Sequence, residues 1–274
     1  MSGTRPSDLP DYENPPLNEV LLSLQFAQPK GFGNIYAGLL WQQFKDKFPK
    51  YQEQPSIPPV FEVFGPNPAT TPPFQISMGV PSLRYWFFNE NEVIQVQSDR
   101  FIHNWRKTES EEEYPHYELI QEKFRKAISI FETFLRDNSL GELRPNQCEI
   151  AYINQIDLPD DMNPHENLQK IFRFLNESLV PVSSLKFEDS NIQMRYIIED
   201  GNEKLGRIHI HIMPALRITD QKPIIQLSLT VRGKPKEETI ESVFNFFDQG
   251  RSLIVKSFDS LTTPEMHVRW RKKL

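Results

Sequence analysis

The sequence His209-Ile210-His211 has the clearest capacity for chemistry in this chain. Side chains at positions i and i+2 of a β-strand point to the same side of the sheet, so both imidazoles could bind one metal ion. A catalytic metal site needs a third ligand, usually His, Asp or Glu, and none stands at a recognisable ligand spacing. Of the remaining histidines, only His103 falls on a predicted strand. We therefore assign no metal ligand, and a metal-assisted hydrolase centred on His209 and His211 stays an alternative.

The histidine pair belongs to a larger set of polar residues at alternating strand positions. Such rows predict a polar sheet face that binds a ligand or a partner segment, although a plain solvent-exposed face gives the same pattern. The candidate ligand-binding residues are Arg207, His209, His211, Gln226, Ser228, Thr230, Arg232, Gln95 and Gln97, with Gln147 and Glu149 on a further strand of this face.

Other residues that often carry chemistry favour structural roles. Cys148 lies within an apolar strand row, which is typical of a small buried hydrophobe. Asp157, Asp160 and Asp161 lie in a proline-containing loop, where solvated charges are expected. The sequence has no Gly-rich phosphate loop, nucleophile elbow or zincin motif. These patterns name no catalytic residue and no cofactor, and they favour a protein that is not an enzyme.

The composition limits the classes of protein to consider. The 274 residues include 31 basic and 37 acidic ones, for a net charge of −6. This balance disfavours a dedicated duplex-DNA-binding protein, although the basic segment 267–274 keeps a nucleic-acid contact open. A single cysteine excludes an intramolecular disulfide and is consistent with a cytoplasmic protein. No apolar run approaches the roughly 20 residues of a membrane helix, and the first residues lack the apolar core of a signal peptide.

Proline divides the chain into regions. Residues 1–16 contain four prolines and little apolar content, so we expect a flexible arm before a single compact domain over 17–274. A second group of prolines lies in 55–81, where only short or edge strands can form, because proline has no N–H to donate. Phe61, Phe64 and Phe74 lie among these prolines, which predicts that the segment is pinned to the core.

Hydrophobic periodicity predicts the elements that position the polar rows. Apolar stripes at spacings of three and four predict long helices over 33–49, 115–137 and 237–260, a shorter helix over 165–178, and a last one beginning at Thr262. Alternating patterns predict strands over 19–26, 83–88, 93–97, 101–106, 147–156, 192–199, 207–213 and 224–232.

Short turns join most of these strands, so the strands must be antiparallel. We predict an α+β fold with an antiparallel sheet of about 7–10 strands and the three long helices packed on one face. The regions 17–110 and 111–274 share a loose pattern of strands with one long helix. They are therefore candidates for two similar halves, without a residue-level repeat.

Four segments, read together, resemble a known family. They are Tyr12-Glu-Asn-Pro-Pro-Leu-Asn-Glu-Val20, Val93-Ile-Gln-Val-Gln-Ser-Asp-Arg-Phe101 with Asn104-Trp105, Gly141-Glu-Leu-Arg-Pro-Asn-Gln147, and Ser257-Phe-Asp-Ser-Leu-Thr-Thr-Pro-Glu-Met-His267 with Trp270. In this order they resemble a sporadically distributed family of bacterial proteins of similar length with no assigned function. The resemblance implies a bacterial source and a patchy occurrence that suits mobile or defence-associated genes. It supplies no catalytic residues.

We predict a non-enzymatic binding or sensing protein of bacteria that grips a protein partner or small ligand on its polar sheet face, with a role in defence as the hypothesis for its setting. The alternatives are the metal-assisted hydrolase and a nucleic-acid contact through Arg207, Arg232 and the basic tail. Ligand identity and oligomeric state stay open.

Overall fold

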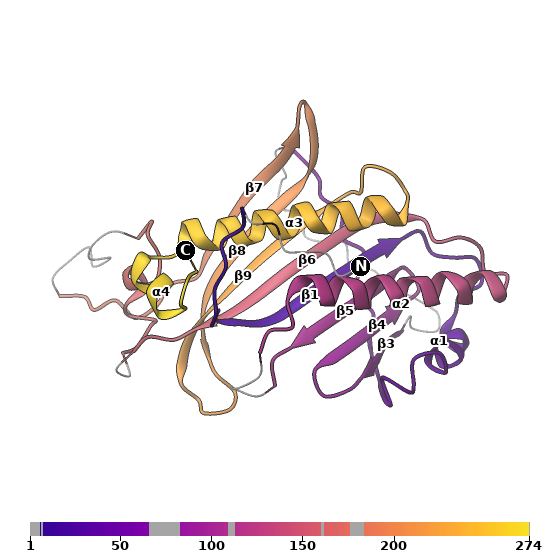
Figure 1. The fold of residues 1–274 in the computed structure, drawn as a ribbon, viewed down its shortest axis with the longest axis horizontal. Helices are drawn as coiled ribbons and strands as arrows, with labels where there is room; N and C mark the ends of the chain where they lie inside the picture. Colours follow the sequence, from indigo (N-terminus) through magenta and orange to yellow (C-terminus); the bar gives the residue numbers. More distant parts are fainter. Residues whose placement is uncertain are drawn as a thin grey trace.

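The computed structural model describes residues 6, 8–65, 83–108, 113–159, 162–175 and 184–273. Over these ranges, nine strands form one antiparallel sheet in the order β2-β3-β4-β5-β1-β6-β9-β8-β7 (Figure 1). The strands are β1 (Leu17–Phe26), β2 (Lys50–Pro55), β3 (Leu83–Phe88), β4 (Glu92–Gln97), β5 (Arg100–Arg106), β6 (Pro145–Ile156), β7 (Ile192–Asp200), β8 (Glu203–Leu216) and β9 (Pro223–Gly233). The predicted α+β class and antiparallel sheet are confirmed, and β2 is an additional strand.

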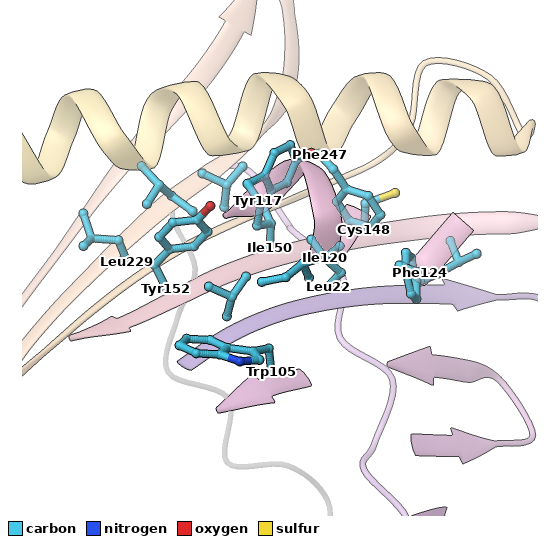
Figure 2. Close-up of a cluster of buried hydrophobic side chains, with 14 of the residues drawn as sticks. Leu22, Trp105, Tyr117, Ile120, Phe124, Cys148, Ile150, Tyr152, Leu229 and Phe247 are labelled. Atoms are coloured by element: carbon cyan, nitrogen blue, oxygen red, sulfur yellow. The ribbon is translucent and has the colours of Figure 1, made fainter. Parts of the chain in front are cut away.

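The core lies between this sheet and two long helices on one of its faces (Figure 1). Figure 2 shows Phe124 and Phe247 of these helices together with Leu22 and Ile150 of the sheet. Cys148 is buried as predicted, and burial raises the pKa of its thiol. The helices are α1 (Asn34–Trp41), α2 (Tyr117–Asp137), α3 (Ile240–Leu261) and α4 (Pro264–Arg269). None of the helices in the described ranges is long and apolar enough to cross a membrane.

The first predicted helix is shorter than expected. It ends at Trp41, whose indole N–H donates to the carbonyl of Phe48 at 3.0 Å and closes a series of turns that leads into β2. Phe44 and Phe48 remain buried through these turns, as the apolar stripe predicts. Ile35 and Leu39 also lie at the apolar spacings of the predicted helix, but they are 77% and 50% exposed because the short helix buries only one narrow side.

The predicted helix over 165–178 is wrong in type. In the described residues it is a single 3-10 turn, Leu168–Lys170. The following chain pairs with the end of α3 instead: Phe172 forms a β-bridge with Thr262, and the N–H of Arg173 donates to the carbonyl of Leu261 at 2.9 Å. This long-range pairing competes with helix propagation, and the apolar side chains that suggested a helix are buried by it.

The strand order has an internal symmetry. Antiparallel β1 and β6 lie side by side at the centre, and each is flanked by the last strand of a meander, β3-β4-β5 or β7-β8-β9. A long helix follows each meander, α2 in the first case and α3 in the second. Apart from the edge strand β2, the strand order thus repeats from β1 to α2 and from β6 to α3, so α2 belongs to the first repeat and not to the predicted half 111–274. A duplication of the chain stays a prediction.

Residues 8–16, part of the predicted flexible arm, lie against α3 and the C-terminal residues (Figure 1). Tyr12 forms a β-bridge with Lys272, and its hydroxyl donates to Asp259 at 2.6 Å. The side chains of Leu9 and Tyr12 are buried. The described part of the arm is therefore packed onto the domain.

Gly250 of α3 lies in close contact with the sheet. A Cβ at this position would lie 2.6 Å from Cγ2 of Ile150 and 3.2 Å from Cγ1 of Val231. We expect Gly250→Ala to lower the free energy of unfolding by about 1 kcal/mol, because crowding of the core outweighs the gain in helix propensity. Gly38→Ala is the control: it lies in α1 with no atom within 4 Å of its Cβ, so it should stabilise. Urea unfolding measures both, and equal stabilisation by both would contradict the close packing.

Candidate functional site

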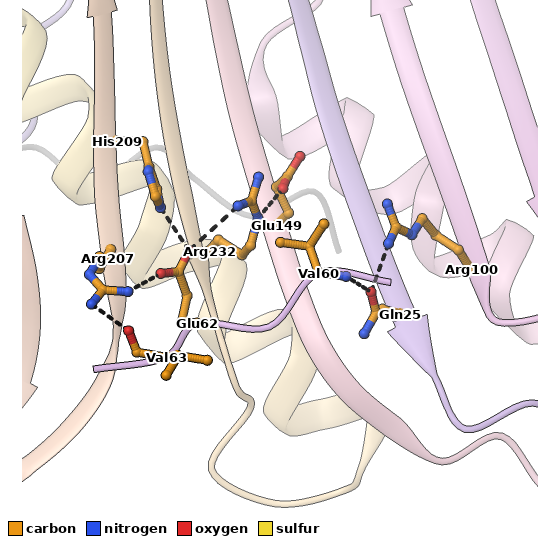
Figure 3. Close-up of polar contacts among 9 residues, drawn as sticks. All are labelled: Gln25, Val60, Glu62, Val63, Arg100, Glu149, Arg207, His209 and Arg232. Carbon is orange, nitrogen blue, oxygen red and sulfur yellow. Dashed lines mark hydrogen bonds and ion pairs between the residues drawn. The ribbon is translucent and has the colours of Figure 1, made fainter. Parts of the chain in front are cut away.

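Part of the chain crosses the sheet face opposite α2 and α3. Residues 57–64, which we call the strap, are extended and belong to no strand. Figure 3 shows the strap passing over the strands from Gln25 toward Arg207. Alternate side chains point away from the sheet, so Phe61 and Val63 are 50% and 61% exposed. The polar face therefore has an occupant from the same chain.

Side-chain amides of the sheet bind the backbone of the strap. The N–H of Ile57 donates to Oε1 of Gln97 at 2.9 Å, and Nε2 of Gln97 donates to the carbonyl of Ile57 at 2.8 Å. The N–H of Val60 donates to Oε1 of Gln25 at 2.9 Å. The two prolines between them have no N–H that needs a partner, and the carbonyl of the first accepts from Nη2 of Arg100 at 3.1 Å. Contacts of this kind normally come from a neighbouring strand.

The only acidic side chain of the strap lies among three cationic or basic side chains (Figure 3). Glu62 is 7% exposed; it accepts from Arg207, contacts Nε2 of His209 at 2.7 Å and lies 3.5 Å from Nη1 of Arg232. Burial would raise the pKa of this carboxyl, but the hydrogen bonds with His209 and Arg207 and the nearby charge of Arg232 hold it at about 2. Glu62 is therefore a carboxylate at neutral pH.

The strand register explains why this carboxylate is needed. Arg207 of β8 and Arg232 of β9 are directly opposite one another, and like charges in that position destabilise a sheet. Glu62 lies between them, and Glu149 of β6 also pairs with Arg232. The guanidinium of Arg207 lies 4.5 Å from the centroid of the Phe64 ring, which adds a cation–π contact to the strap.

Four of the nine predicted binding residues contact the strap: Gln97, Arg207, His209 and Arg232. The structure does not bring the others into this cluster. Nε2 of His211 lies 2.8 Å from Oδ1 of Asn191, Gln226 contacts Ser228 at 3.4 Å, and Thr230 is opposite His209 in the ladder. The prediction that the proline segment is pinned to the core is wrong for Phe61, which is 50% exposed. Phe64 contacts Arg207 on the polar face, and it is the strap backbone that polar side chains of this face bind. Phe74 lies outside the described residues.

Gln95 belongs to a separate polar chain across four strands. It accepts from Nη1 of Arg84 at 2.7 Å and donates to Oδ1 of Asn104 at 2.8 Å, and Asn104 donates to Oε1 of Glu19 at 2.6 Å. Burial raises the pKa of Glu19. This chain links polar side chains of β3, β4, β5 and β1 beside the strap, while Nε of Arg84 is left without a hydrogen-bond partner.

The two histidines of the HIH sequence have different partners. His209 contacts Glu62, whereas His211 contacts Asn191. His103 lies on the other face of the sheet, where its Nε2 is 3.3 Å from Glu92. Within the described ranges, no three His, Cys, Asp or Glu side chains are grouped to hold a metal ion. The geometry therefore gives the hydrolase alternative no support.

The basic tail is paired with acidic residues. Met266 and Trp270 are buried, and Thr263 caps α4 with Pro264 in its first turn. The ion pairs are Arg269 with Asp157 at 2.7 Å, Arg271 with Glu13 at 3.7 Å, Lys273 with Asp11 at 2.9 Å, and Lys272 with Asp259. Asp157 is thus part of an ion pair, while Asp160 and Asp161 lie outside the described residues.

Sequence reasoning missed Gln25, Arg100 and Glu62. Gln25 and Arg100 lie near the ends of β1 and β5, where too few residues remain to show an alternation of apolar and polar side chains. Glu62 could have been found from composition, because it is the only charged residue between Pro55 and Ser82. A single charge in an otherwise uncharged segment indicates a specific partner. The polar rows on β8 and β9 contain the basic side chains that pair with it.

Comparison of the chain with protein-family models gave no match. Comparison with curated proteins gave no match either. The fold and the site geometry are therefore the basis for the function proposed below.

Proposed function

We propose that the protein is a non-enzymatic binding protein whose polar sheet face grips an extended acidic segment of a partner protein. The observation that carries this proposal is the strap, whose backbone and carboxylate are bound by side chains of β1, β4, β5, β8 and β9. In this view the strap occupies the face until a partner segment replaces it.

The mode of attachment supports replacement. The strap forms no backbone ladder with the sheet, so its release breaks side-chain contacts only and leaves every strand pairing intact. Recognition of an extended segment by main-chain hydrogen bonds combined with specific side-chain contacts is a recurring mode of peptide binding. A partner segment can therefore compete without unfolding the sheet.

The same contacts define the partner. Gln97 and Gln25 require a backbone N–H at two positions, and the stretch between them tolerates proline. Arg207, His209 and Arg232 require a carboxylate that follows at a fixed distance. A neutral or basic segment would leave Arg207 and Arg232 opposite one another without compensation, so the face selects against it.

A synthetic peptide of residues 55–65 tests this proposal. The tethered strap competes at a high effective concentration, so the wild-type protein should bind a labelled peptide weakly. Glu62→Ala removes the acidic anchor from the tethered strap, and this variant should bind the peptide at least about ten-fold more tightly, measured by fluorescence anisotropy. Glu142→Ala, at an exposed loop position, should behave as wild type.

A peptide carrying Gln in place of Glu62 should bind the Glu62→Ala variant far more weakly than the natural peptide. A second protein, with residues 57–63 replaced by glycine and serine, repeats the test without relying on one substitution. Absence of saturable binding to both folded variants would contradict the proposal.

The setting that we propose is the bacterial cytoplasm, with a role in defence. Support comes from the single cysteine and from the resemblance of the four sequence segments to a patchily distributed bacterial family.

A further inference from the structure

A second feature, independent of the strap, lies on the opposite face of the sheet. A cavity of about 660 Å³ opens between residues 10–17, the start of α2 and the side of α3. This volume is in the range of small-molecule sites. Strands β6 and β9 contribute Tyr152 and Leu229 from the helix-facing side, so the cavity shares no lining residue with the strap cluster.

One wall of the cavity is apolar. Leu17, Leu229 and Phe258 are buried core residues whose side chains also line it, together with Ile254 of α3. Contact with these side chains would remove a hydrocarbon or aromatic body of a ligand from water. The wall therefore favours a ligand with an apolar part.

Hydrogen-bond donors also line the cavity, and one of them, Tyr152 of β6, is directly opposite Leu229 of β9. The hydroxyls of Tyr114 and Tyr152 are 3.1 Å apart, so one donates to the other and the second keeps its proton for a further acceptor. Burial raises the pKa of Tyr114 well above its ordinary value and that of Tyr152 to about 12, so both are neutral donors. The guanidinium of Arg251, 4% exposed, also lines the cavity and pairs with Glu118 at 3.0 Å.

His116, immediately before α2, also lines the cavity, and its backbone is strained. Its φ of 64° and ψ of 150° fall in a region that side chains with a Cβ rarely adopt. No side chain caps the helix at this residue, and the positive end of the α2 dipole lies there. Strain at a non-glycine residue that lines a cavity is typical of a binding site.

The charges of the lining residues select the kind of ligand. Four basic side chains, Lys107, Arg251, Arg271 and Lys273, stand against three acidic ones, Asp11, Glu13 and Glu113. Two of these acids are paired with Arg271 and Lys273. Arg251 is itself paired with Glu118, so the charges of the described lining residues and this partner balance. Balanced charges disfavour a phosphate dianion beside these carboxylates, and a ligand with a single negative charge suits the phenol donors.

We propose that this cavity binds a small amphipathic carboxylate, with its apolar body against Leu229, Ile254 and Phe258 and its carboxylate at Tyr114, Tyr152 and His116. The phenol that does not donate to its neighbour donates to the carboxylate, and Arg251, paired with Glu118, lines the same cavity. The proposal does not depend on the strap or on the function proposed for the polar face.

Calorimetric titration of the full chain with 2-naphthoate and with its neutral analogue 2-naphthalenemethanol tests the proposal. We expect saturable 1:1 binding of both probes, with the acid bound at least about ten-fold more tightly. Tyr114→Phe and Tyr152→Phe should remove most of this preference and leave the alcohol unchanged. Tyr51→Phe, at an exposed ring on the edge strand, is the control and should change neither probe.

Two further variants separate binding from folding. Leu229→Trp fills the cavity and should abolish binding of both probes while circular dichroism shows a folded protein. His116→Gly relieves the strained backbone, so it should raise Tm. It should also weaken the binding of 2-naphthoate. The proposal is overturned if neither probe saturates, if acid and alcohol bind equally, or if the tyrosine variants keep the full preference for the acid.

Discussion

Glu62→Ala is expected to lower the free energy of unfolding by about 3 kcal/mol, the lower end of the range for breaking a buried ion pair. The loss is large because Arg207, His209 and Arg232 all contact this one carboxylate, whose side chain is 7% exposed, although Arg232 keeps its pair with Glu149. It is not larger because the three partners are 13%, 28% and 23% exposed and recover part of their hydration. Urea unfolding at neutral pH measures the effect.

Two controls sharpen this result. Glu62→Gln keeps the shape and one acceptor oxygen, so it should cost less than Glu62→Ala. Glu142→Ala removes an exposed loop carboxylate and should change stability by no more than about 0.5 kcal/mol. Equal stability of Glu62→Ala and wild type would mean that the strap is not held by its acidic anchor.

Acid should destabilise the protein steeply between pH 4.5 and 2. Glu92 is a second buried carboxyl: burial would raise its pKa, but hydrogen bonds with His103 and Lys123 hold it at about 2, as for Glu62. The ordinary value for both in the unfolded chain is 4.5. Folded pKa values below the unfolded ones contribute stability that is present above pH 4.5 and is lost as the pH falls toward 2.

Each carboxyl should account for about 2 kcal/mol of this loss once solvent screening of its partners is allowed for, and the two together for about 4 kcal/mol. Urea unfolding at pH 7, 4.5, 3 and 2.5 measures it. The double variant Glu62→Gln and Glu92→Gln should be less stable at pH 7 and much less pH-dependent below 4.5. The same slope in the variant and the wild type would assign acid unfolding to other groups.

The strands could be predicted from local patterns because the alternation of apolar and polar residues within one strand indicates which of its side chains are buried. The alternation of Ile208, Ile210 and Ile212 against polar neighbours is a property of adjacent residues, and it specifies a strand with two different faces. The same alternation placed Arg207 and His209 together. Antiparallel pairing followed from the short turns.

The strap and the cavity depend on residues that are far apart in the sequence. Glu62 and Arg232 are 170 positions apart, and no periodicity links them. Helix patterns failed where a distant segment intervened, as at Phe172, whose β-bridge to Thr262 replaced a helix. The strain at His116 has no signal in the sequence either, because its φ and ψ fall in a region that is essentially restricted to glycine.

The strap gives the repeated strand order a further meaning. The strap lies between β2 and β3 in the sequence. It contacts Gln97, Gln25 and Arg100 of its own repeat. It then contacts Arg207, His209 and Arg232 of the other repeat. In the language of assemblies, the two repeats resemble subunits of a dimer fused into one chain, and the strap is an arm that one subunit extends over its neighbour. Because the carboxylate is on the arm and its cations are on the other subunit, the pseudo-dimer is asymmetric: the repeat that carries the strap binds its backbone at residues 57–60, and the other repeat binds the carboxylate of Glu62 and the carbonyl of Val63.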